Sequence, residues 1–210
     1  HLTTTFNNQY SGLERNQVLL ERAPDLDLNL LPDNWKNARI IHFAPVANEI
    51  AINSGELIAD SPTYYSLQGW LRKWDNNGEI SPIQFPNIPR LPGNPLGGFL
   101  SIEDLGNDRT FLDPLRALFP LLILTLGPDG SQLYQGQNVT SVPSPPVSES
   151  DPTGAGDIFA TAFIIDNVIH KRSKIDSAVF ASALAALSTT KPGQAGIPSS
   201  REIKEIQEVP

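Results

Sequence analysis

The sequence predicts an α/β layered fold built on a mainly parallel sheet. Short apolar runs typical of buried parallel strands, such as residues 38–44 and 121–125, alternate with segments of helical periodicity. The chain has 210 residues, of which 40% are hydrophobic, which is enough for one sizeable core. In such a fold we expect ligands at the carboxyl ends of the strands.

The first half of the chain carries weaker signals than the second. Residues 3–10 alternate polar and aromatic side chains, which predicts a strand ending in a turn at Gly12. Residues 38–44 form an apolar run that stops at Pro45, and residues 57–60 predict a shorter strand. Proline and glycine crowd between positions 82 and 98, which predicts a loop.

The second half predicts a regular succession of elements. Asp108 is placed to cap a helix that reaches Phe119. Gly136 separates two halves of a hairpin. The expected strands cover residues 98–101, 121–125, 131–134 and 138–142. The expected later helices cover residues 155–169, 175–190 and 200–208.

Composition excludes several classes of protein. The formal net charge of −8 and the absence of a basic cluster argue against nucleic-acid partners. The longest apolar run, residues 120–126, is too short to span a membrane. With no Cys and three His, the chain can form neither a disulfide framework nor an ordinary structural zinc site. These features predict a soluble, cytoplasmic protein. The chain also contains no Met, even at position 1, which predicts a piece lacking its N-terminal portion.

The strongest functional signal is Asp151-Pro-Thr-Gly-Ala-Gly-Asp157, directly followed by the apolar segment 158–165. Gly154 and Gly156 let backbone amides crowd around an anion, and a helix starting there points its N–H groups at the same place. Phosphate fits this description, and Asp157 could accept a proton from an attacking hydroxyl. The alternative is a glycine-containing turn in which Asp157 only favours the helix dipole.

A second glycine segment, Thr125-Leu-Gly-Pro-Asp-Gly130, follows a predicted strand. It is ordinary turn material when taken alone. Together with residues 151–157 it could give a nucleotide two glycine-lined contacts.

These segments resemble the PfkB carbohydrate kinase family of the ribokinase-like superfamily. Residues 151–157 are similar to its second signature, and residues 125–130 to its T-x-G-x-x-G nucleotide segment. Residues 193–198 resemble its adenine-side loop. The resemblance covers residues 98–200 well and residues 1–75 only loosely.

The resemblance implies one ribokinase-like domain over residues 1–210, with three α/β/α layers and ATP, Mg²⁺ and a small sugar or polyol as ligands. It implies Asp157 as the catalytic base and Gly154, Ala155 and Gly156 as the anion hole. The nucleotide-binding residues that it implies are Thr125, Gly127, Gly130, Gly193 and Gly196. It leaves open whether a monovalent cation binds and whether the protein forms a homodimer.

Three departures from the family pattern stand out. The stretch matching its Asn-x-x-Glu segment is Ser101-Ile-Glu-Asp104, so the metal or phosphate role falls to Glu103 or Asp104. Pro152 replaces the usual Thr of the signature. The Gly-Gly segment and early Asp that grip the substrate in the family are not found. Residues 68–75 resemble a segment of inositol-kinase-like members, and, like Asp60, they either supply an acceptor-side group or form a packed loop.

The sequence therefore predicts an ATP-dependent kinase acting on a hydroxyl of a sugar or polyol. The alternative is a non-catalytic relative that binds a nucleotide or sugar for regulation. A dinucleotide-dependent oxidoreductase is a third reading, but residues 154–156 lack the third glycine of the G-x-G-x-x-G motif.

Overall fold

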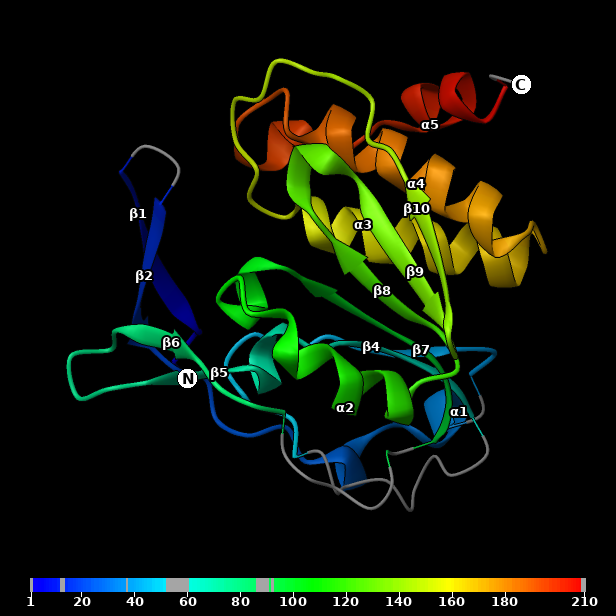
Figure 1. The fold of residues 1–210 in the computed structure, drawn as a ribbon. Helices are drawn as coiled ribbons and strands as arrows, with labels where there is room; N and C mark the ends of the chain where they lie inside the picture. The colour runs from blue at the N-terminus through cyan, green and yellow to red at the C-terminus, as the bar shows by residue number, and fades with distance from the viewer. Residues whose placement is uncertain are drawn as a thin grey trace. The chain divides into compact units, whose positions relative to one another are not determined.

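The computed structural model describes residues 2–11, 14–36, 38–51, 61–85, 91 and 93–208. The chain divides into two compact units (Figure 1). Unit 1 comprises residues 1–98 and 102–120, and unit 2 comprises residues 99–101 and 121–210. The single domain over residues 1–210 stays a prediction.

Unit 1 contains two antiparallel hairpins and a parallel strand pair. The first hairpin joins β1 (Thr5–Ser11) to β2 (Glu14–Glu21), and the second joins β5 (Arg72–Trp74) to β6 (Ile80–Pro82). Strand β3 (Ile41–Phe43) is parallel to β4 (Pro62–Ser66). The helices of unit 1 are α1 (Asp33–Lys36) and α2 (Leu112–Leu118), with single helical turns η1 (Leu28–Leu30), η3 (Gln68–Trp70), η4 (Glu103–Leu105) and η5 (Arg109–Phe111).

Aromatic side chains fill the core of unit 1. The Tyr65 ring is fully buried, and its centroid lies 5.6 Å from those of Phe43 and Phe119 and 6.1 Å from that of Trp70. His42 also lies on β3, with its Nε2 2.9 Å from the Ser66 hydroxyl. Burial lowers the pKa of His42 to about 4, so its ring is neutral at pH 7.

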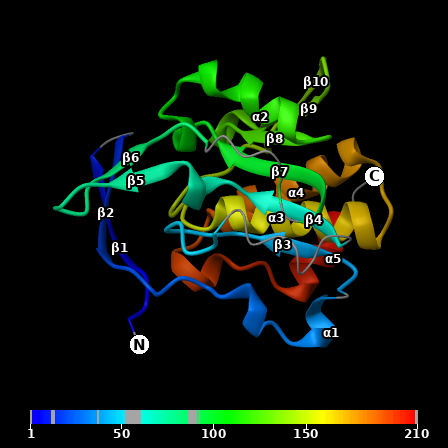
Figure 2. The same ribbon diagram turned by 90° about the horizontal axis from the view of Figure 1, so that it is seen from below.

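Unit 2 consists of an antiparallel meander and three helices. The meander is formed by β8 (Leu122–Thr125), β9 (Ser131–Gln135) and β10 (Asn138–Val142). Helix α3 (Ala155–Ile164) continues into the π-helical turn η7 (Ile165–Ile169), and is followed by α4 (Lys174–Ser188) and α5 (Ser200–Gln207). Helices α3 and α4 lie side by side in both views (Figures 1 and 2). Strand β7 (Asn94–Ser101) gives its last three residues to this unit.

Most elements predicted for the second half are confirmed. Helices α3, α4 and α5, strand β8 and the β9–β10 hairpin all lie within a few residues of their predicted bounds. Asp108 caps its helical segment, accepting a 2.9 Å hydrogen bond from the Thr110 amide. In the first half, β1 and β3 are confirmed. The strand predicted at 57–60, with Asp60, and the turn at Gly12 lie outside the described residues.

The prediction of a loop between positions 82 and 98 is wrong at both ends. Strand β6 ends at Pro82, and β7 begins at Asn94 and includes Pro95, Gly97 and Gly98. Proline is tolerated in the first residues of a strand, where a missing N–H costs little. Gly97 and Gly98 are both buried.

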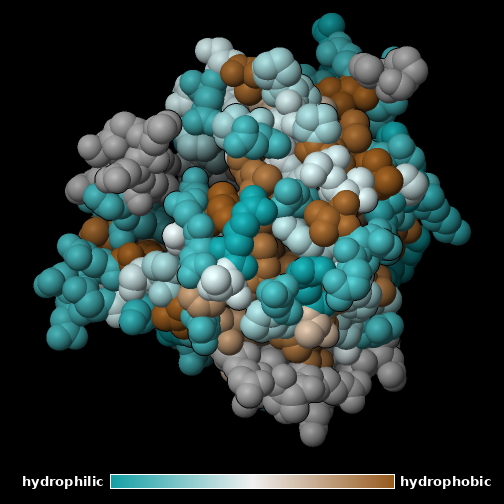
Figure 3. Space-filling view, in the orientation of Figure 1, coloured by the Kyte–Doolittle hydropathy of each residue, from teal (hydrophilic) through white to brown (hydrophobic). Residues whose placement is uncertain are grey.

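The visible surface mixes hydrophilic residues with hydrophobic ones (Figure 3). The large hydrophobic side chains that remain exposed include Ile175 and Val179 on α4. Single exposed side chains of this kind are normal for folded proteins.

Candidate functional site

The predicted anion loop, residues 151–157, starts helix α3. Gly154 is the N-cap and has φ 86°, a left-handed conformation that favours glycine. A Cβ at Gly154 or at Gly156 would meet no other atom within 4 Å. Gly154, Gly156 and Asp157 are exposed, so the first turn of α3 opens to the surrounding solvent. The first N–H groups of a helix have no acceptor inside the helix, which suits this end to an anion, and the Ala155 amide donates here to the Pro152 carbonyl at 3.2 Å.

Aromatic packing holds this helix terminus in place. Phe159 and Phe163 on α3 face Phe99 at the end of β7, with ring centroids 6.4 Å and 5.6 Å from that of Phe99. All three side chains are buried. The contact begins two residues after Asp157, so the first turn is attached to a rigid part of unit 2.

Asp151 joins the anion loop to the loop predicted to face adenine. One carboxylate oxygen accepts a hydrogen bond from the Thr153 amide at 2.9 Å, and the other accepts one from the Gly193 amide at 2.9 Å. The amides of Ser150 and Asp151 both donate to the Thr189 carbonyl. This role was not predicted from the sequence. An Asp side chain that accepts a hydrogen bond from the amide two residues on, as Asp151 does from Thr153, is a known turn signal.

We expect Asp151→Asn to loosen residues 193–196, because an amide side chain keeps only one acceptor oxygen. Loss of a hydrogen bond to a charged group costs about 1.5–3 kcal/mol. The exchange of the Gly193 or the Thr153 amide hydrogen should therefore accelerate by roughly tenfold or more, measured by NMR hydrogen exchange. The control is Asp113→Asn, whose exposed carboxylate contacts only Arg116 among the hydrogen bonds described. Unchanged exchange at both amides would contradict the bridging role.

The predicted nucleotide segment begins at the end of β8. The Thr125 hydroxyl donates to the Leu100 carbonyl at 3.4 Å. Gly127 opens the turn η6 (Gly127–Asp129), is exposed, and has open space where a Cβ would stand. Gly130 closes the turn with φ 88° and is buried, and a Cβ there would overlap the Val142 carbonyl. Gly127 can therefore face a ligand, whereas Gly130 fixes the path of the chain.

The two glycines of the loop predicted to face adenine differ in the same way, since one is exposed and the other is buried. Gly193 and Gly196 bound the turn η8 (Gly193–Gly196). Gly193 is exposed and donates its amide to Asp151. Gly196 is buried, and a Cβ there would overlap the Ser188 carbonyl. The exposed member of each pair is the better candidate for a ligand contact.

The acidic pair Glu103 and Asp104 belongs to unit 1, whereas the other predicted site residues belong to unit 2. Both lie on η4. Glu103 is exposed. Asp104 accepts a 3.2 Å hydrogen bond from the Gln68 side chain, and its oxygen lies 3.9 Å from a guanidinium nitrogen of Arg72. The metal or phosphate role of this pair stays a prediction.

Two further findings concern metals and membranes. Within the described ranges, no group of three or more His, Asp or Glu side chains is arranged to hold a metal ion. No helix in that part of the chain is both long and apolar enough to cross a membrane.

Comparison with known proteins relates the second half of the chain to one family. Residues 114–200 match the family described as pfkB family carbohydrate kinase. Fructokinase-1 of Zea mays is 25% identical over 217 residues, covering 91% of this chain. Fructokinase-1 of Oryza sativa subsp. japonica is 32% identical over 202 residues, covering 93% of this chain. The chain spans 67% of the maize protein and 62% of the rice protein.

The fold has close counterparts among solved structures. A pyrophosphate-dependent kinase in the ribokinase family, solved as a sulfate complex, superposes with a TM-score of 0.76 at 18% identity. The match covers 97% of this chain and 74% of that one. The predicted ribokinase-like α/β fold is confirmed.

Proposed function

We propose that this chain, whose residues 114–200 match the pfkB family of carbohydrate kinases, forms part of an ATP-dependent kinase. The enzyme transfers the γ-phosphoryl group of ATP to a hydroxyl of a sugar or polyol. The observation that carries this proposal is the exposed first turn of α3, where Gly154 and Gly156 place no side chain over the backbone and the exposed Asp157 follows them.

In this proposal Asp157 is the general base. Its carboxylate accepts the proton of the acceptor hydroxyl as that oxygen attacks the γ-phosphorus, and the bond to the β-phosphate oxygen breaks. The amides of Gly154, Ala155 and Gly156 form the anion hole. They stabilise the charge that redistributes over the phosphoryl oxygens, aided by the positive end of the helix dipole.

The nucleotide is proposed to contact the exposed glycines of unit 2. Gly127 and Gly193 offer backbone without side chains, and Asp151 ties Gly193 to the anion loop. Mg²⁺ usually keeps several waters and is bound through one or two carboxylates and the substrate phosphates. Glu103, an exposed carboxylate of unit 1, is a ligand of the type that such an ion takes. The ion would neutralise the phosphate charge.

The regulatory alternative is less well supported, because Asp157 is retained at an exposed helix start. The test is release of ADP by the whole protein with Mg-ATP and a panel of fructose, ribose and myo-inositol. Pyrophosphate serves as a second donor, since the structural relative named above uses it. We expect turnover that depends on one class of acceptor. Binding of ATP without turnover on any acceptor would favour the regulatory alternative, and absence of both would contradict the proposal.

A further inference from the structure

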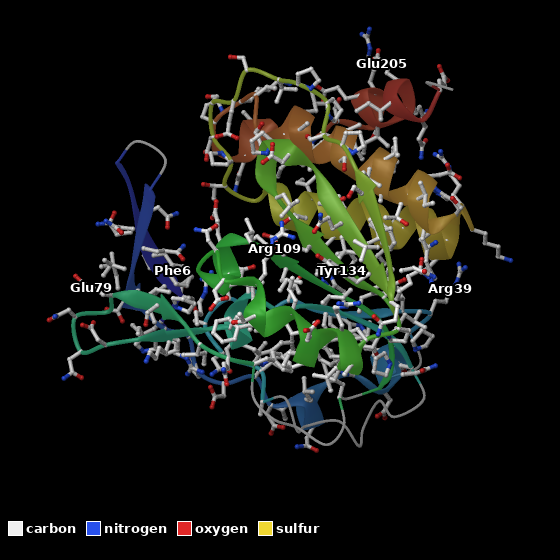
Figure 4. All side chains as sticks on the ribbon, in the orientation of Figure 1. Phe6, Arg39, Glu79, Arg109, Tyr134 and Glu205 are labelled. Carbon is white, nitrogen blue, oxygen red and sulfur yellow. The ribbon has the colours of Figure 1, made fainter. Side chains whose placement is uncertain are left out.

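The turn between β5 and β6 carries a chemically labile pair of residues. Asn77 is followed by Gly78, and this is the only Asn-Gly pair in the chain. The Asn77 side chain is exposed, whereas Gly78 is buried. The turn projects outward from unit 1 in both views (Figures 1 and 2), and Glu79, the residue that follows it, is labelled in Figure 4.

Asparagine is a labile residue in proteins, and a following glycine exposes it to attack by its own backbone, because no Cβ crowds the attacking amide. The Gly78 nitrogen bonds to the Asn77 Cγ, the bond from Cγ to Nδ2 breaks, and ammonia leaves with the proton of the Gly78 amide. Water then opens the resulting succinimide ring. Opening at Cγ yields aspartate. Opening at the backbone carbonyl carbon yields isoaspartate, in which the main chain runs through the former side chain and is one methylene longer.

The Asp75 side chain restrains the turn in which this attack takes place. One of its carboxylate oxygens accepts hydrogen bonds from the amides of Asn77 and Glu79, both at 2.9 Å. The Gly78 amide donates to the Asp75 carbonyl at 3.0 Å, and it has to give up this hydrogen bond before it reacts. The rate therefore depends on how often the turn opens, which Asp75 limits.

The same turn connects the two hairpins of unit 1. The Leu19 amide on β2 donates to the Gly78 carbonyl at 2.8 Å, and Val18 forms a β-bridge with Glu79. Gly78 has φ 81°, and a Cβ there would overlap the Leu19 carbonyl, so its backbone lies directly against β2. An extra methylene in the main chain just before Gly78 would displace this contact.

We propose that Asn77 is a site of spontaneous deamidation and isomerisation, restrained by Asp75, and that its isoaspartate product detaches the β5–β6 turn from β2. Water is the only co-reactant. The inference is independent of the proposed kinase activity, because it uses no residue of unit 2.

The first test is peptide mapping by mass spectrometry after incubation of the whole protein for several weeks at mildly alkaline pH. Asn138 is the matched control, since it is also exposed in a hairpin but precedes Val139, whose branched side chain crowds the attacking amide. We expect Asn77 to convert at least about tenfold faster than Asn138, to a mixture of aspartate and isoaspartate. Asp75→Ala should accelerate the conversion by about tenfold or more, because two hydrogen bonds to a charged group are lost.

The second test compares the hydrogen exchange of the Leu19 amide in fresh and in converted protein by NMR. We expect exchange to be at least about tenfold faster after conversion, because the acceptor carbonyl of Gly78 has moved. Asn77→Gln is the control for this test. Its longer side chain forms the larger cyclic imide only slowly, so incubation should leave its Leu19 exchange unchanged. Circular dichroism before incubation checks that each variant is folded.

Three results would overturn the inference in separate parts. Conversion of Asn77 no faster than that of Asn138 would remove the modification site. An unchanged rate in folded Asp75→Ala would remove the restraint. Unchanged Leu19 exchange in protein that carries isoaspartate at position 77 would show that the product does not detach the turn.

Discussion

Asp157→Asn is expected to lower the turnover number of the kinase by at least about 10²-fold while ATP affinity stays within about threefold of the wild-type value. The amide is similar in size to the carboxylate but cannot accept the proton of the acceptor hydroxyl. ATP binding should be retained because the proposed anion hole consists of backbone amides, which this substitution leaves in place. Steady-state kinetics and an ATP titration measure the two effects separately.

Helix α4 offers a control matched in position. Asp176 is the third residue of α4, as Asp157 is the third residue of α3, and both are exposed. Asp176→Asn removes a comparable interaction with a helix dipole, worth typically about 0.3–1 kcal/mol, and weakens the hydrogen bond that its carboxylate accepts from the Ser173 hydroxyl. It should slightly lower the midpoint of thermal unfolding and leave turnover unchanged. Near-normal turnover in Asp157→Asn would mean that this carboxylate only favours the helix dipole, which is the alternative that the sequence left open.

The parts of the site that could be predicted depend on short segments of sequence. Gly154 and Gly156 are two positions apart, and the apolar helix that anchors them follows at once. The Asp108 cap contacts an amide only two residues away. Local patterns of this kind specify a backbone conformation whatever the rest of the chain does.

The parts that could not be predicted depend on contacts between distant segments. The hydrogen bond from Gly193 to Asp151 joins residues 42 positions apart, and that from Gln68 to Asp104 joins residues 36 positions apart. Strands β5 and β6 are three residues long and carry no clear alternation, so only their pairing with each other defines them. Residues 68–75 alone could therefore not distinguish an acceptor-side group from a packed loop.

The two glycines of the nucleotide segment are expected to respond differently to the same substitution. Gly130→Ala places a Cβ against backbone atoms, overlapping the Val142 carbonyl and approaching the Pro143 carbonyl carbon to 2.8 Å. Gly130 also has φ 88° and ψ −134°, a region that side chains strongly disfavour. Since backbone atoms on a paired strand cannot easily move, we expect a loss of about 3–5 kcal/mol in the free energy of unfolding. The midpoint of thermal unfolding should fall by about 10 °C or more.

Gly127→Ala is the matched comparison, because Gly127 also has a positive φ, of 59°, but open space at the Cβ position. Left-handed backbone costs a non-glycine residue about 1–2 kcal/mol, so the unfolding midpoint should fall by only a few degrees. If the phosphates of ATP lie against this exposed turn, the new methyl group collides with them, and the KM for ATP should rise by about tenfold. Equal losses of stability in the two variants would contradict the structural role of Gly130. An unchanged KM in Gly127→Ala would remove this turn from the nucleotide site while leaving Asp157 and the anion hole untouched.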